Sequence, residues 1–184
     1  DTGNHTWFGP DPASPADTWL TSPPLVVGSA ARLSVSFQHR YDFEGSPQEY
    51  YDSAVIELST DDGATWSDIG VTLYPGTLTS QGSNPLRGRK AFVGRSASYP
   101  AFEKVTIDLG PNFAGKTVRF RFRLGSDDAA AVRGWEVDDL TFTGLADPRR
   151  YSTLPSPGQL RCVPHLPGGV QCHSVVMGLR SSSC

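Results

Sequence analysis

The residues Phe37–Trp66, FQHRYDFEGSPQEYYDSAVIELSTDDGATW, decide how this chain folds. They hold two alternating runs on either side of a short acidic and aromatic loop. Over residues 31–43 apolar residues and His39 occupy every second position, and this strict period of two predicts a strand with one buried face. Residues 52–60 alternate in the same way, and Asp61-Asp62-Gly63 is a signal for a tight hairpin turn. The stretch therefore predicts consecutive antiparallel strands.

The same alternation recurs along the chain, and it predicts an all-β fold. Residues 117–124 should bury their apolar positions and turn Arg119, Arg121 and Arg123 outward. Phe37, Ile56, Phe120 and Trp135 should be nearly fully buried. Further strands are expected over 18–21, 25–27, 66–69, 91–93, 103–109 and 135–143, whereas 1–17 and most of 72–101 should be irregular. Since no segment shows helical spacing, we predict an antiparallel jelly-roll β-sandwich.

The end of the chain differs from the rest. We expect one sandwich domain over residues 1–146 and an irregular, proline- and serine-containing tail over residues 147–184, either clipped onto the sandwich or largely flexible. All three cysteines, Cys162, Cys172 and Cys184, lie in this tail. A Cys162–Cys172 disulfide is the preferred prediction. The alternative is a zinc site using the same cysteines with His165 and His173, although their spacing matches no known finger.

Composition and motifs argue against several functions. The chain of 184 residues has a formal charge of −3, which disfavours a nucleic-acid partner, and it has no apolar run long enough for a membrane span. It lacks a Gly-x-Ser-x-Gly elbow and a His-Glu-x-x-His zinc motif. His39 falls on an apolar strand face and should be a core residue. Asp127 and Asp128 are adjacent, so on a strand they would face opposite ways, unlike a glycosidase pair. We therefore expect no catalysis.

Three acidic residues are candidates for a metal site. Glu44 ends one predicted strand and Asp52 begins the next, so a hairpin brings both to one end of the sheet. Asp138 shares an alternating face with Leu140 in the last strand, and a carboxylate turned toward a core needs a partner or a metal. Oxygen ligands of this kind suit calcium. The alternative is that these acids form ion pairs at the rim with nearby arginines.

Three motifs together resemble a jelly-roll module of secreted bacterial proteins. They are HRYDFE…YYDSAVIELSTDDGATW, FAGKTVRFRFRLGSD and GWEVDDL, within residues 17–145. The module is an accessory domain beside the catalytic domains of immune-inhibitor-A-type and fungalysin-type metallopeptidases, and it is similar in outline to MAM and CUB-like sandwiches. The resemblance implies that the positions of Glu44, Asp52 and Asp138 form a cation site. It does not extend to the tail.

These observations predict a non-catalytic, calcium-stabilised accessory domain of a secreted bacterial metallopeptidase, of which this chain is a mature or excised part. It should be monomeric and should contact the parent catalytic domain, a protein substrate or a cell-surface glycan. The alternative is a carbohydrate-binding module using loop tyrosines, namely Tyr50, Tyr51, Tyr74 and Tyr99. The turn Ser59–Trp66 matches the Asp-box of sialidase propellers, but it occurs once, so we expect a purely structural turn.

Overall fold

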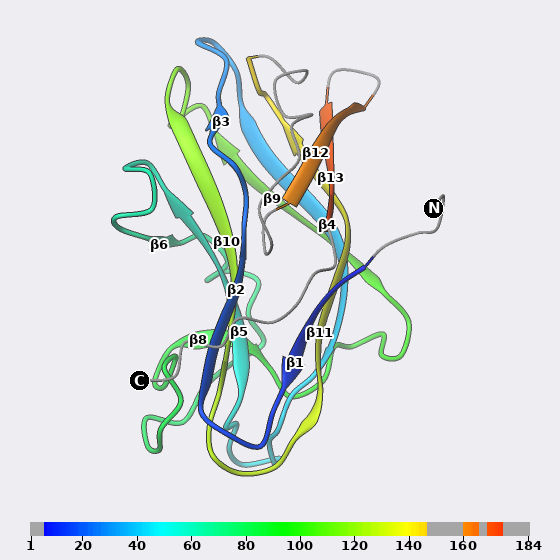
Figure 1. Cartoon of the computed structure of the whole chain (residues 1–184). Coiled ribbons are helices and arrows are strands. Elements are labelled where there is room, and N and C mark those ends of the chain that lie inside the picture. The colour runs from blue at the N-terminus through cyan, green and yellow to red at the C-terminus, as the bar shows by residue number, and fades with distance from the viewer. Residues whose placement is uncertain (1–5, 147–159, 166–168, 175–184) are drawn as a thin grey trace.

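The protein is a sandwich of two antiparallel β-sheets, as the computed structural model in Figure 1 shows. The structure describes residues 6–146, 160–165 and 169–174, and these contain no helix, so none that could span a membrane. The predicted all-β sandwich is confirmed. Its strands are β1 (Trp7–Asp11), β2 (Ala16–Thr21), β3 (Leu25–Val26), β4 (Leu33–Asp42), β5 (Ser53–Ser59), β6 (Ser67–Asp68), β7 (Gly76–Thr77), β8 (Lys90–Val93), β9 (Glu103–Gly110), β10 (Thr117–Ser126), β11 (Val132–Thr143), β12 (Leu160–His165) and β13 (Gly169–Ser174).

The two sheets exchange strands along the chain. The first sheet has the order β12-β13-β11-β4-β9, with β1 also paired to β11. The second has the order β2-β10-β5-β8-β7, with β3 on β10 and β6 on β5. Within residues 6–146 the chain crosses between the sheets at β1–β2, β3–β4, β4–β5, β8–β9, β9–β10 and β10–β11. Each crossing loop therefore carries residues from one sheet to the other at an end of the sandwich.

Alternation sets which side chains face the core. Every second residue of β4 is buried, from Leu33 to Tyr41, and β10 follows the same pattern. Arg119, Arg121 and Arg123 lie on the outer face of β10, as predicted, and each is paired with a carboxylate. Because the side-chain period is two, a slip of one residue would have placed these charges inside.

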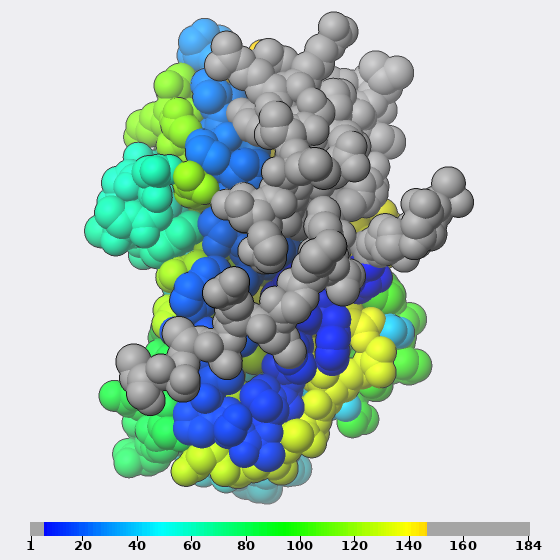
Figure 2. Space-filling view, viewed as in Figure 1, coloured from blue at the N-terminus to red at the C-terminus, as the bar shows by residue number. Residues whose placement is uncertain are grey.

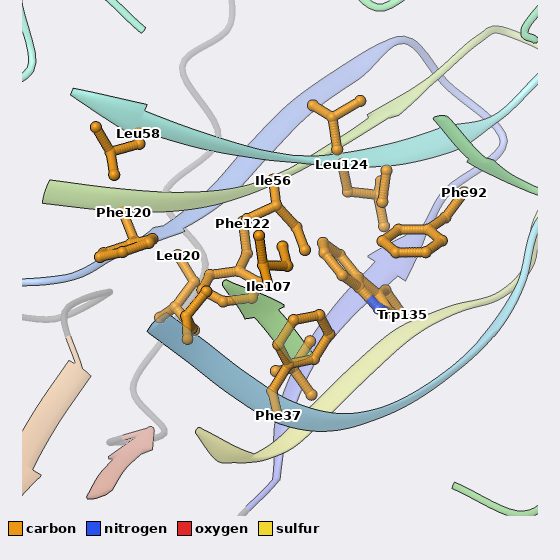
Figure 3. Close-up of a cluster of buried hydrophobic side chains, with 14 of the residues drawn as sticks. Leu20, Phe37, Ile56, Leu58, Phe92, Ile107, Phe120, Phe122, Leu124 and Trp135 are labelled. Atoms are coloured by element: carbon orange, nitrogen blue, oxygen red, sulfur yellow. The ribbon is translucent and has the colours of Figure 1, made fainter. Parts of the chain in front are cut away.

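Aromatic and aliphatic side chains fill the space between the sheets (Figure 3). Phe37, Ile56, Phe120 and Trp135 are fully buried, which confirms the predicted core. Phe37 meets Phe122 edge to face at 5.3 Å, so a residue of β4 contacts one of β10 across the interface of the sheets. Such aromatic pairs add to the stabilisation that burial provides.

The start of the chain is more regular than predicted. Instead of an irregular segment, residues 7–11 form β1, which pairs with β11. Trp7 packs edge to face on Trp135 at 5.8 Å, whereas Phe8 is half exposed. Gly134 permits this pairing, because a Cβ atom there would collide with the backbone carbonyl of Gly9. The partner strand lies more than a hundred residues away, which is why local pattern did not reveal β1.

The segment after the sandwich also contributes strands. The expected irregular tail contains β12 and β13, which pair with each other, and β13 pairs with β11 through Leu140, Thr141 and Phe142. The backbone register places Cys162 directly opposite Cys172. That register is compatible with the predicted disulfide, which stays a prediction. Cys184 lies outside the described residues.

Candidate cation site

Four acidic residues gather at one end of the sandwich, at the bottom of Figure 1. Glu44 follows β4, Asp52 precedes β5, Asp127 follows β10, and Asp11 ends β1. Strand register explains the meeting, since Gly125 of β10 is opposite Ser53 of β5. The residues that follow Gly125 must therefore lie beside those that precede Ser53.

Three of these carboxylates are close enough to share one ion. One oxygen from each of Glu44, Asp52 and Asp127 lies within 4.8 Å of the other two. Asp52 is fully buried and Asp127 is 9% exposed, whereas Glu44 is partly buried. No other group of three or more acidic, histidine or cysteine side chains in the described residues meets the same criterion. This cluster is the candidate site.

Asp52 is the centre of the cluster. Its Oδ1 accepts hydrogen bonds from the Asp127 backbone N–H at 2.7 Å and from Asn84 Nδ2 at 3.3 Å. Its Oδ2 is buried without any hydrogen-bond partner. Burial raises the pKa of Asp52 to about 6, because a buried charge loses its hydration. An unpartnered buried carboxylate oxygen is costly, so this atom needs either a proton or a cation.

Asp11 presents a second unpartnered oxygen. Its side chain is buried, its Oδ2 accepts a long hydrogen bond of 3.4 Å from the Glu44 backbone N–H, and its Oδ1 has no donor. Burial and then the neighbouring Asp52 carboxylate raise the pKa of Asp11 to about 8. A cation near Asp52 would remove this repulsion. The alternative is a proton shared by Asp11 and Asp52, and the two possibilities differ in their response to a chelator.

Backbone amides and one amide side chain hold the cluster in place. Glu44 Oε2 accepts from the Ala130 N–H at 2.9 Å, and Asp127 Oδ1 accepts from the Ala129 N–H at 2.9 Å. The fully buried Asn84 donates to the carbonyls of Tyr51 and Gly125, both at 2.8 Å. Asn84 thus joins the excursion between β7 and β8 to the two loops that carry Asp52 and Asp127.

Asp138 lies elsewhere. It is opposite Gln38 in the pairing of β11 with β4, and its carboxylate accepts from Thr6 Oγ1 at 3.3 Å and from the Asp139 N–H at 2.8 Å. The pairing is irregular between Asp138 and Thr141, and Asp139 has a φ of 48°. This bulge shifts the alternation by one residue, so Asp138 faces outward with Gln38 and not inward with Leu140. The structure brings Asp127, and not Asp138, to Glu44 and Asp52.

The other candidates from the sequence, His39 and the loop tyrosines, are buried or partly buried among other side chains. His39 is fully buried, and its Nδ1 accepts from Trp135 Nε1 at 3.2 Å, while its Nε2 faces Glu103 at 3.4 Å. Burial lowers the pKa of His39 to about 4, although Glu103 opposes the shift. Burial, and then the charge of Asp68, to which the Tyr74 hydroxyl donates at 2.8 Å, raise the pKa of Tyr74. The remaining loop tyrosines, Tyr50, Tyr51 and Tyr99, are each partly buried.

The single Asp-box turn is a self-contained network. Asp61 accepts from the Thr65 N–H at 2.8 Å and from Ser59 Oγ at 2.7 Å, and Ser59 Oγ accepts from the Gly63 N–H. The Thr65 hydroxyl also donates to Asp61 at 2.5 Å, and this bond, with those from Ser59 and the Thr65 N–H, lowers the pKa of Asp61 to about 2. Gly63 has a φ of 94°, which a residue with a side chain adopts at a cost. The turn thus has the local structural role that the sequence indicated.

Comparison with known proteins gives no further assignment. The chain matches no protein-family model, and no curated protein sequence matches it.

Proposed function

We propose that this sandwich is a calcium-stabilised, non-catalytic accessory domain of a secreted bacterial metallopeptidase. Its role would be to stabilise the parent enzyme or to recognise a protein substrate or a cell surface. One observation carries the cation part of this proposal, namely the buried Asp52 Oδ2 that lacks a partner and lies among further carboxylates. The resemblance of the three strand motifs to peptidase accessory modules supports the accessory role.

The donor set favours calcium among the common metals. Glu44, Asp52 and Asp127 supply only carboxylate oxygens, and Asp11, which lies outside this triad but neighbours Asp52, would add another. Hard oxygen ligands of flexible geometry are typical of calcium, whereas zinc prefers histidine and cysteine. Bound calcium would neutralise the negative charge of the cluster. The four residues come from both sheets, so the ion would connect the sheets at this end.

The surroundings of His39 support a role without catalysis. Its Nδ1 is occupied by the Trp135 indole, and the ring packs among Phe37, Tyr41 and Phe92. A general base must reach a substrate proton, and a fully buried imidazole inside an aromatic core cannot do so.

Thermal unfolding with and without calcium tests the cation. The chain is first treated with excess EGTA and then dialysed, and its melting temperature is compared in EGTA, calcium and magnesium. We expect calcium to raise the melting temperature and EGTA to reverse the rise, with magnesium weaker because it requires a tighter octahedral site. A melting temperature that is the same in all three conditions would leave the shared proton as the explanation of the cluster.

A further inference from the structure

The outer face of the second sheet carries an exposed tryptophan on an edge strand. Trp19 of β2 is 48% exposed, and β2 ends the strand order of its sheet. A second tryptophan, Trp66, is partly buried and lies between β5 and β6. The turn that joins these two strands is turquoise at the left of Figure 2. A single exposed apolar side chain is ordinary, so Trp19 indicates a binding site only if it belongs to a larger arrangement.

The guanidinium group of Arg121 contacts both rings. Its carbon is 5.8 Å from the ring centre of Trp19 and 4.3 Å from that of Trp66. The two indoles are therefore no further apart than the sum of these distances. We name Trp19, Arg121 and Trp66 the tryptophan platform. Cation–π contact with one guanidinium fixes both rings relative to the sheet.

Buried contacts beneath the tryptophan platform make it rigid. Arg121 Nε donates to Glu57 Oε2 at 2.7 Å, and Glu57 is only 3% exposed although it lies on the outer face. Glu57 also accepts from Arg89 at 2.8 Å. The Asp-box network holds the turn before Trp66, and a Cβ atom on Gly63 would come within 3.3 Å of the Trp66 ring. A rigid platform loses little entropy on binding, so it is suited to recognition.

The charges around the tryptophan platform cancel one another. Arg119 pairs with Asp62 at 2.6 Å, and Arg123 pairs with Asp17 at 2.7 Å. A polyanion would have to compete with these carboxylates. A largely apolar partner would have to bury the ion pairs, which costs desolvation. An uncharged sugar avoids both costs, because its C–H face can stack on an indole while its hydroxyls meet the donors and acceptors at the rim.

We propose that the tryptophan platform binds an uncharged polysaccharide chain, with sugar rings stacked on Trp19 and Trp66. This rests on the proposed recognition role and gives it a ligand class. The site uses the outer sheet face and not the loop tyrosines that the sequence indicated. Its predicted contacts involve none of the carboxylates of the cation cluster.

Affinity electrophoresis tests the proposal on the full chain. Native gels contain hydroxyethylcellulose or galactomannan as uncharged probes, and heparin or polygalacturonate as charged comparators. We expect an uncharged polymer to retard the chain. Trp19→Ala should weaken this binding by at least about tenfold, and Trp19→Tyr should keep most of it. The matched control is Phe8→Ala, because Phe8 is 49% exposed but lies on β1 of the other sheet.

Three results would overturn the proposal: no retardation by either uncharged polymer, retardation by the charged polymers alone, or unchanged binding by a folded Trp19→Ala variant. The melting temperature of each variant verifies folding. The same gels run with excess EGTA separate this proposal from the cation. If calcium does not change the melting temperature but the polysaccharide still binds, only the cation proposal is refuted. If calcium raises the melting temperature but no polysaccharide binds, only the tryptophan platform is refuted.

Discussion

Replacing Asp127 by asparagine is the sharpest test of the cation cluster, because the substitution changes the charge and little else. The asparagine oxygen can still accept from the Ala129 N–H, and the backbone N–H that donates to Asp52 is untouched. The matched control is Asp138→Asn, the same chemical change at the residue that sequence alone indicated. Gly134 of β11 pairs with Asp42, close to the cluster. Asp138 lies four residues further along β11, which is roughly 13 Å along the strand.

The expected size follows from linkage between binding and folding. At a calcium concentration a hundredfold above its dissociation constant, binding stabilises the folded state by about 2.7 kcal/mol. If loss of one charged ligand weakens calcium binding about a hundredfold, the stabilisation of the folded state falls to roughly 0.4 kcal/mol at the same calcium concentration. For a domain of this size the difference corresponds to a loss of roughly 5–9 °C in melting temperature.

The effect of Asp127→Asn on the melting temperature should change sign when calcium is removed. Without an ion, the Asp127 charge repels Asp52 and helps to raise the pKa of Asp52. In EGTA, the Asp127→Asn variant should therefore melt at or above the melting temperature of the unsubstituted chain. In calcium, it should melt below that of the unsubstituted chain. Differential scanning fluorimetry in both buffers measures this crossover. The reasoning is refuted if Asp138→Asn, and not Asp127→Asn, removes the calcium response.

Three further outcomes are expected. Phe120→Ala should reduce the free energy of unfolding by about 3–5 kcal/mol in urea titrations, since its fully buried ring packs at a tilt against Phe142 with the ring centres 4.6 Å apart; a loss below about 1 kcal/mol would contradict the packing described. The pKa of His39 is lowered in the folded state to about 4, so the free energy of unfolding of the native chain should fall by up to about 3 kcal/mol relative to His39→Gln as the pH falls from 6.5 toward 4. If the free energies of unfolding of the two chains changed equally with pH, the buried neutral imidazole would be refuted. If Cys162 and Cys172 form a disulfide, reduction should remove roughly 2–3 kcal/mol of local stability from β12 and β13, and hydrogen exchange in the core strands should stay unchanged; cooperative unfolding of the whole chain on reduction would contradict this.

The sandwich could be predicted because its long strands bury one face each. In β4 and β10 the alternation is strict, so the sequence alone sorts their residues into core and surface. Shorter strands carry no such signal. β1 contains Gly9 and Pro10, and its existence depends on pairing with a strand distant in sequence. β12 and β13 are short, so their alternation is a weak signal, and they are defined by their pairing with each other and by the pairing of β13 with β11.

Two of the three carboxylates of the candidate site could be predicted for the same reason. Glu44 and Asp52 flank a loop between two recognisable strands, so their proximity is a local property. The sequence presents Asp127 as a neighbour of Asp128, and its position just after β10 becomes informative only when β10 is paired with β5. Asp138 was misplaced because a bulge interrupts the alternation of β11, and one extra residue exchanges the two faces.

The position of the cluster determines what removal of an ion should do to the molecule. Asp11 and Glu44 belong to the first sheet and its exit loop, whereas Asp52 and Asp127 flank strands of the second sheet. An ion among them would tie the sheets together, so its loss should lower the stability of the whole sandwich and not merely loosen one loop. The tryptophan platform depends on β2, β5, β10 and the turn before β6. It should therefore keep its shape without calcium for as long as the sandwich stays folded, and its ligand binding should fail only at the temperature where the sheets separate.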